Sequence, residues 1–218
     1  MKKNTTVLLV GVMVLLVVLI GFFVVKNKNK PVEEVEEETV AELPQNLWPA
    51  ITLTPTQDPS VPKSLGRFLN FKVQKINVPK AATMDYLLVY NTSDGGQQGV
   101  PGSVKLTGGD VEKMLLLGSA SSGKYRFDSG VSEGTMTITF RDEKGKSLGR
   151  VVSDFHLQTE VVELSSVDGN FKYTLDKPAK GVFFVTVKTL AEPQGVTTVV
   201  WKDGYGVYAS DGKPHEGK

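Results

Sequence analysis

The feature that most constrains this chain is an uninterrupted apolar run, Val7 to Val25, which contains no charged or strongly polar residue. As a helix its nineteen residues would span about 28 Å, close to the hydrocarbon thickness of a bilayer. The alternatives are a cleaved signal peptide and a buried core helix. A signal peptide usually has a shorter apolar region that ends at small residues, whereas here two phenylalanines and two valines precede Lys26. We therefore expect an uncleaved transmembrane helix at 7–25 that anchors the protein in the lipid bilayer.

The orientation of this helix is set less by charge than by the lengths of its flanks. Lysines lie on both sides of the run, so the positive-inside count is nearly balanced. The tail at 1–6 is short and holds two lysines, which makes it awkward to translocate, while a long domain crosses largely regardless of its charge. We expect a single-pass protein of the cell membrane, with a cytoplasmic N-terminus and the C-terminal domain outside.

A spacer is expected at 26–62, made of a basic flank followed by an acidic, proline-rich stretch. Residues 31–62 hold six of the eleven prolines and carry six Glu and one Asp, with no Lys or Arg. Such segments stay extended and solvated. Within the stretch, Leu47, Trp48 and Ile51 are apolar enough to dock on the following domain or on the membrane interface, and the sequence leaves both possibilities open.

Residues 63–210 have the pattern of an all-β domain, with short apolar segments separated by Gly, Asp, Asn and Pro. Met136, Ile138 and Phe140 alternate with threonines, which is typical of a half-buried strand. Only 111–117 offers room for a helix. About ten strands are expected, and the clearest of the others lie at 69–73, 86–90, 148–157, 171–175, 182–187, 196–201 and 205–209.

This pattern predicts an antiparallel β-sandwich, Ig-like in general architecture, with a barrel as the runner-up. The stretch 181–187, followed by 196–201, resembles the last two strands of immunoglobulin-like modules. The Cys…Trp…Cys framework of such modules is missing, so the resemblance supports the architecture only. A polar C-terminal tail is expected at 211–218.

The inventory of reactive residues is thin. The chain has no cysteine, which excludes disulfides, thiolate nucleophiles and Cys-type zinc sites and favours a bacterial envelope protein. Residues 118–124 match the GxxxxGK outline of a phosphate-binding loop, but Tyr125 replaces the Ser or Thr that ligates magnesium. The glycines that follow predict a turn between strands instead of a helix.

The histidines, acids and basic residues also fail to suggest chemistry. Only His156 and His215 exist, no GxSxG elbow is present, and the Asp-Gly pairs lack the repeated acids of a calcium loop. We therefore expect no metal and no cofactor. Residues 63–218 carry 20 basic and 17 acidic side chains, too even a balance for nucleic-acid binding.

Trp201, Tyr205 and Tyr208 cluster near the C-terminal strands and form a candidate binding surface, although core packing is the commoner fate of such residues. We interpret the protein as a non-enzymatic binding or adhesion module whose partner is an unknown envelope protein or polysaccharide. One alternative is an accessory subunit of a cell-envelope complex. Another is an envelope hydrolase that uses His156, with Asp154 two residues away on the same face of a strand.

Overall fold

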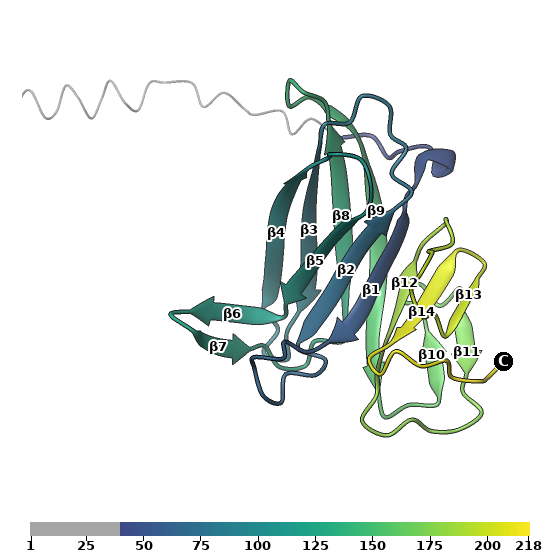
Figure 1. Ribbon diagram of the computed structural model, residues 1–218. Helices are drawn as coiled ribbons and strands as arrows, with labels where there is room; N and C mark the ends of the chain where they lie inside the picture. Colours follow the sequence, from purple (N-terminus) through teal and green to yellow (C-terminus); the bar gives the residue numbers. More distant parts are fainter. Residues whose placement is uncertain (1–39) are drawn as a thin grey trace, which may run out of the picture. The chain divides into compact units, whose positions relative to one another are not determined.

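The structure is a computed structural model that describes residues 40–218 as one compact unit. The expected anchor at 7–25 lies outside these residues. Within 40–218, none of the helices has the length and apolar character needed to cross a membrane. The described part is all-β: apart from the short 3-10 helix η1 (Gln45–Leu47), its regular elements are fourteen strands in antiparallel sheets (Figure 1).

The larger sheet has seven strands in the spatial order β13-β14-β12-β9-β8-β3-β4. Their bounds are β13 Val200–Lys202, β14 Tyr205–Ala209, β12 Phe183–Lys188, β9 Ser147–Thr159, β8 Glu133–Arg141, β3 Thr83–Asn91 and β4 Gln97–Lys105. A second sheet has the order β1-β2-β5, with β1 at Ala50–Thr56, β2 at Phe68–Gln74 and β5 at Val111–Leu116. Two short hairpins complete the unit: β6 (Gly118–Ser121) with β7 (Lys124–Phe127), and β10 (Glu163–Ser165) with β11 (Lys172–Thr174).

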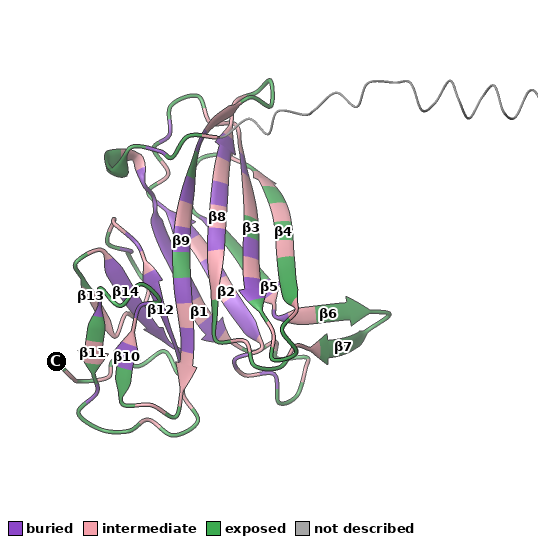
Figure 2. Ribbon diagram, turned by 180° about the vertical axis from the view of Figure 1, so that it is seen from behind, coloured by how far each residue is buried: buried purple, intermediate pink, exposed green. Residues whose placement is uncertain are grey.

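The main core lies between the three-stranded sheet and one face of the seven-stranded sheet (Figures 1 and 2). Strand β8 shows how the sequence builds it. Because successive side chains of a strand point to opposite faces, Met136, Ile138 and Phe140 are fully buried, while the threonines between them lie on the outer face. Leu53 and Phe71 cover this face from the second sheet. The alternation predicted for this segment is confirmed.

A second, smaller core explains why the apolar run before Lys188 is continuous. Strands β12 and β14 are buried on both faces. Val185 and Val187 point into the main core, whereas Phe184 packs into the second core with Leu164 and Phe171 from the segments around β10 and β11. A strand with both faces covered has no need of polar residues at alternate positions.

The domain begins well before residue 63, so the expected spacer boundary is wrong. Strand β1 pairs along its whole length with β2, and Leu43, Trp48 and Ile51 belong to the main core. The prolines misled the prediction. Pro55 lies inside β1, which is the edge strand of its sheet, and an edge strand tolerates a residue without an amide hydrogen. The open question about Leu47, Trp48 and Ile51 is thereby answered, because all three pack on the domain.

Residues 211–218 form part of the domain and not a free tail. The backbones of Thr174 and Lys218 exchange two hydrogen bonds of 2.8 and 2.9 Å. The ring of His215 lies edge-on to Phe184, with centroids 5.0 Å apart. Backbone pairing of this kind needs no apolar side chain, so hydropathy gave no sign of it.

Other segments also differ from expectation. Residues 111–117 contain strand β5, not a helix. Residues 86–90 form part of strand β3, as predicted, which presents one face to the core and leaves Leu87 40% exposed on the other. Of 196–201, only the last two residues belong to β13, which pairs with β14 and not with β12.

Candidate binding site

The β6–β7 hairpin, called the arm below, projects from the side of the domain (Figure 1). Ser121 pairs with Lys124, so Ser122 and Gly123 form a two-residue turn, and both have positive φ, +49° and +74°. This is the conformation of a type I′ turn, whose twist matches that of a hairpin. The segment with the GxxxxGK outline therefore contains strand β6 and the predicted turn, and Lys124 begins a strand where a phosphate-binding loop would begin a helix.

The arm has two chemically different faces, because side chains alternate along its strands. On one face Ala120 lies opposite Tyr125, next to the pair formed by Gly118 and Phe127. On the other face serines of β6 lie opposite basic residues of β7, in the pairs Ser119–Arg126 and Ser121–Lys124. Except for the pair at its base, Gly118 and Phe127, every residue of the arm is exposed (Figure 2).

The apolar face of the arm continues onto the outer face of the three-stranded sheet. The ring of Phe68 makes edge contacts with Tyr125 and Phe127, both at 6.1 Å between centroids. Leu116 pairs with Phe68, and Met114 lies two residues further along the same face of β5. We call these five residues the aromatic patch. Met114 is 51% exposed and Tyr125 39% exposed, so the patch contains two of the five large hydrophobic side chains that are exposed within residues 40–218.

The base of the arm is held firmly. Gly118 has φ +152°, and a Cβ atom there would lie 2.1 Å from the carbonyl oxygen of Arg126, so only glycine fits. The Leu117 amide donates a hydrogen bond to the Arg67 carbonyl oxygen at 2.9 Å. The Leu117 carbonyl oxygen accepts one from the Asp128 amide at 3.1 Å. The Asp128 carboxylate in turn accepts the hydroxyl of Tyr90 at 3.0 Å. Burial raises the pKa of Tyr90, and the hydrogen bond to Asp128 raises it further, so this hydroxyl stays a donor.

The arm and residues 41–43, with which the domain begins, lie at opposite ends of the domain. Residues 41–43 run beside Arg150 near the start of β9, through hydrogen bonds of 2.8 and 2.9 Å. The arm instead leaves next to the end of β3, where Ser93 donates its amide to Ser129 at 2.8 Å. Strands β3 and β8 run between these two ends (Figure 1).

Two of the three aromatic residues predicted to form a binding surface are buried. Tyr208 is fully buried in the main core. Tyr205 is 7% exposed, stacks on Phe171 in the second core and donates its hydroxyl to Asp168. Trp201 is half-buried and donates its indole N–H to the Thr189 carbonyl at 3.1 Å. Tyr205 and Tyr208 are three residues apart on β14, so they point to opposite faces, and both faces of that strand are covered.

The histidines are engaged in structural contacts. His156 Nδ1 lies 2.9 Å from the carbonyl oxygen of Ser165, and Asp154 accepts a hydrogen bond from Thr135 instead of from His156. His215 pairs with Asp211 at 3.1 Å. Within residues 40–218, no three His, Cys, Asp or Glu side chains are grouped so as to hold a metal ion. The pairing of Asp154 with His156 on which the hydrolase alternative rests is therefore not formed, whereas the Ser165 hydroxyl oxygen lies 3.4 Å from His156 Nδ1.

Sequence reasoning missed the arm, although the signal was present. Lys124 to Phe127 alternate between basic and aromatic side chains, and a Ser-Gly pair precedes them. That is the pattern of a hairpin strand after a two-residue turn. Comparison of the chain with protein-family models, curated proteins and solved structures finds no match, so its function has to be inferred from its own geometry.

Proposed function

We propose that this protein is a non-enzymatic binding module, tethered to the cell membrane by 7–25 and exposed outside the cytoplasm, which contacts another envelope protein through its arm and aromatic patch. We further propose to class its two layers as a β-sandwich of Ig-like general architecture. The sequence supports the tether, because the apolar run has the length of a membrane span. The shared core of the two sheets supports the architecture.

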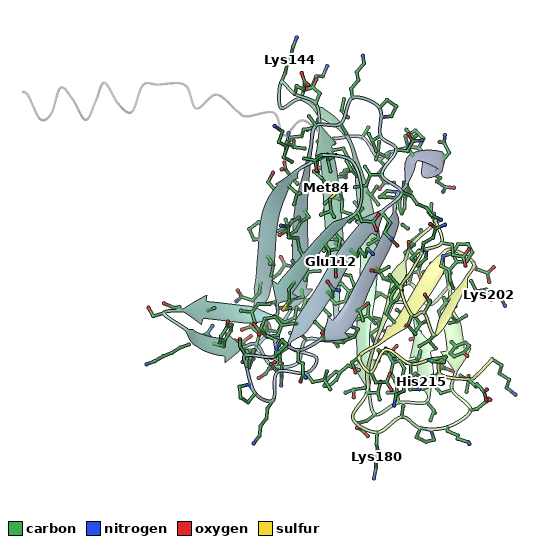
Figure 3. The ribbon with its side chains drawn as sticks, in the orientation of Figure 1. Met84, Glu112, Lys144, Lys180, Lys202 and His215 are labelled. Atoms are coloured by element: carbon green, nitrogen blue, oxygen red, sulfur yellow. The ribbon has the colours of Figure 1, made fainter. Side chains whose placement is uncertain are left out.

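The observation that carries the proposal is the exposure of the arm. An isolated two-stranded hairpin is at best marginally stable in water, and this one presents short unpaired strand edges together with a half-exposed tyrosine. Larger contiguous exposed apolar patches rimmed by polar residues mark interaction sites. Here Met114 has Glu112 two residues away on the same face of β5, where Glu112 accepts a hydrogen bond from Asn70 at 2.7 Å. Figure 3 shows Glu112 on the three-stranded sheet.

A protein partner fits this surface better than a polysaccharide. The thioether of Met114 is flexible and polarizable, which suits a surface that adapts to another protein. The unpaired edges of β6 and β7 also offer backbone donors and acceptors to a partner strand. The arm lies at the end of the domain away from residues 41–43.

Site-specific photo-crosslinking tests the proposal. A benzophenone amino acid replaces Tyr125 in the full chain, and in the control it replaces Leu87, which is equally exposed on the outer face of β3. We expect a discrete protein adduct from position 125 and none from position 87. Met114→Lys should abolish the adduct, whereas Val162→Lys, at a similarly exposed valine elsewhere, should not. Identical adducts at both positions would refute the proposal, and an adduct that resists protease would favour a polysaccharide partner.

Topology needs its own test, and the absence of native cysteine makes it clean. Ser93 is exposed, so Ser93→Cys should react in intact cells with a membrane-impermeant maleimide, while Thr5→Cys should not. Labelling of Thr5→Cys alone would place the domain inside the cell and remove the envelope-partner proposal.

A further inference from the structure

At the end of the domain opposite the arm, three lysines line an open cleft of about 830 Å³. They come from separate segments: Lys80 from the β2–β3 connection, Lys105 from the end of β4 and Lys144 from the β8–β9 turn. Figure 3 shows Lys144 at the tip of that turn. Two backbone hydrogen bonds hold the segments together, from Ala82 to Arg141 at 2.7 Å and from Leu106 to Ala82 at 2.8 Å. The cleft is therefore part of the rigid sheet end.

The ammonium groups of these lysines are available to a ligand. Within residues 40–218, none of Lys80, Lys105 and Lys144 takes part in an ion pair or a side-chain hydrogen bond, and each is exposed. Their neighbours differ in this respect. Lys72 pairs with Asp110 at 3.2 Å, and Lys75 donates to the carbonyl oxygen of Glu192 at 2.7 Å.

Two acids also line the cleft, but one of them is committed to the turn. The Asp142 carboxylate accepts the backbone amides of Lys144 and Lys146, both at 2.9 Å, which shapes the β8–β9 turn. Glu143 is exposed at the same turn and opposes the lysines in part. Positive charge from three segments therefore faces two carboxylates, of which only Glu143 has no structural task within the cleft.

The backbone at Lys80 forms a turn at the rim of the cleft. Ala81 donates to the carbonyl oxygen of Val78 at 3.2 Å, so Pro79 and Lys80 are the central residues of a turn, and Lys80 has φ +66°. The second central residue of such a turn is normally glycine or asparagine, because a side chain is disfavoured at positive φ. A lysine at this position keeps an ammonium group at the rim of the cleft, at the expense of conformational strain.

We propose that this cleft binds a phosphate-bearing anion with two or more negative charges, and that Lys80, Lys105 and Lys144 contact its oxygens. Lysine acts as a point-charge donor to phosphate without demanding a fixed geometry, which suits an open cleft. Both a soluble phosphate compound and the headgroup of a membrane lipid carry this chemistry. The site is separate from the arm, so the outcome of its test does not depend on the function proposed for the arm.

Calorimetric titration of the full chain in neutral detergent with pyrophosphate tests the site. Lys80→Gly and Lys105→Ser should each weaken binding about tenfold, and Glu143→Gln should strengthen it, because that change removes the opposing charge. Lys63→Gly is the matched control: Lys63 is also exposed with positive φ, +58°, but lies outside the cleft. Both glycine variants should raise the midpoint of unfolding, and only Lys80→Gly should weaken binding.

Titration with a short-chain phosphatidic acid then separates the two sources of phosphate. Binding of the lipid alone, with the same lysine dependence, assigns the site to a headgroup, and binding of pyrophosphate alone assigns it to a soluble ligand. The proposal is overturned if neither compound binds at millimolar concentration, if the lysine variants bind as tightly as the unaltered chain, or if Glu143→Gln weakens binding.

Discussion

The hydroxyl of Tyr208 offers a sharp test of the packing between the two sheets. Tyr208 is fully buried in the main core, and within residues 40–218 its hydroxyl has no hydrogen-bond partner. Burial raises the pKa of this phenol, so the group stays protonated and uncharged. A buried polar group left without a partner costs about 1–3 kcal/mol, since it loses water and gains nothing.

Tyr208→Phe should therefore stabilise the fold. The void left by one oxygen is smaller than a methyl group, for which the cost is about 1 kcal/mol. Subtracting this cost from the desolvation penalty that the substitution removes leaves a net increase of about 1 kcal/mol in the free energy of unfolding. Tyr90→Phe is the matched control, because Tyr90 is equally buried but donates to Asp128 at 3.0 Å. Losing a bond to a charged group should cost about 1.5–3 kcal/mol, so the two variants should change stability in opposite directions.

Urea unfolding of the fragment 40–218 measures both changes. The two tryptophans of the chain, Trp48 in the main core and Trp201 at the half-buried β13, report on different regions. Coincident transitions from both would license a two-state free energy by linear extrapolation. If Tyr208→Phe destabilises the fragment as much as Tyr90→Phe does, the Tyr208 hydroxyl has a partner, such as a buried water, and the reasoning is refuted.

Three further predictions test other parts of the fold. Thr186→Val should also stabilise the fragment by about 1 kcal/mol in urea unfolding, because the Thr186 hydroxyl is a second buried group without a partner in the described part of the chain. Burial raises the pKa of Asp168, but hydrogen bonds from Ser166 and other neighbours outweigh it and hold the pKa well below its usual value. The stability from those hydrogen bonds is present above the ordinary carboxyl pKa of about 3.9 and is lost as the pH falls through the lower pKa of the folded state. Unfolding midpoints measured between pH 5 and pH 2 should therefore decline less in Asp168→Asn than in the unaltered protein. Gly118→Ala should loosen the base of the arm, because the new Cβ atom would clash with the Arg126 carbonyl oxygen. Amide hydrogen exchange should then become faster in β6 and β7 and stay unchanged in the core. Unchanged exchange in the arm would contradict the role given to this glycine.

The sequence predicted those parts of the fold in which a local pattern reflects a single buried face. Met136, Ile138 and Phe140 alternate with threonines because β8 has one face in the core and one in solvent. Strand β1 escaped prediction because its prolines and the acidic stretch before it have the composition of a spacer, and composition does not reveal that Pro55 occupies a sheet edge. The order of the seven-stranded sheet depends on pairings between distant segments, which no local pattern encodes.

The burial of two candidate binding residues has a related cause. Tyr205 and Tyr208 are close together in sequence, but they alternate across β14 into two different cores. The second core forms only because the β10–β11 hairpin covers the outer face of β12 and β14, and that contact is invisible in a local window. Within residues 40–218 the exposed aromatic residue is Tyr125, in a segment whose glycines and serines favour a plain turn.

The two proposed sites differ in physical character, and their dependence on salt should tell them apart. Strand β3 has nine residues, so about 30 Å separates the cleft next to Thr83 from the region next to Asn91 where the arm leaves the domain. This exceeds the screening length of about 8 Å at physiological ionic strength, so charge at one site has little effect on the other. Contact through the aromatic patch buries apolar surface and should change little with added salt. Binding at the cleft relies on exposed ammonium groups and should weaken steeply as salt is added. If the crosslink at Tyr125 disappeared in parallel with pyrophosphate binding as the salt concentration rose, the two sites would not be independent.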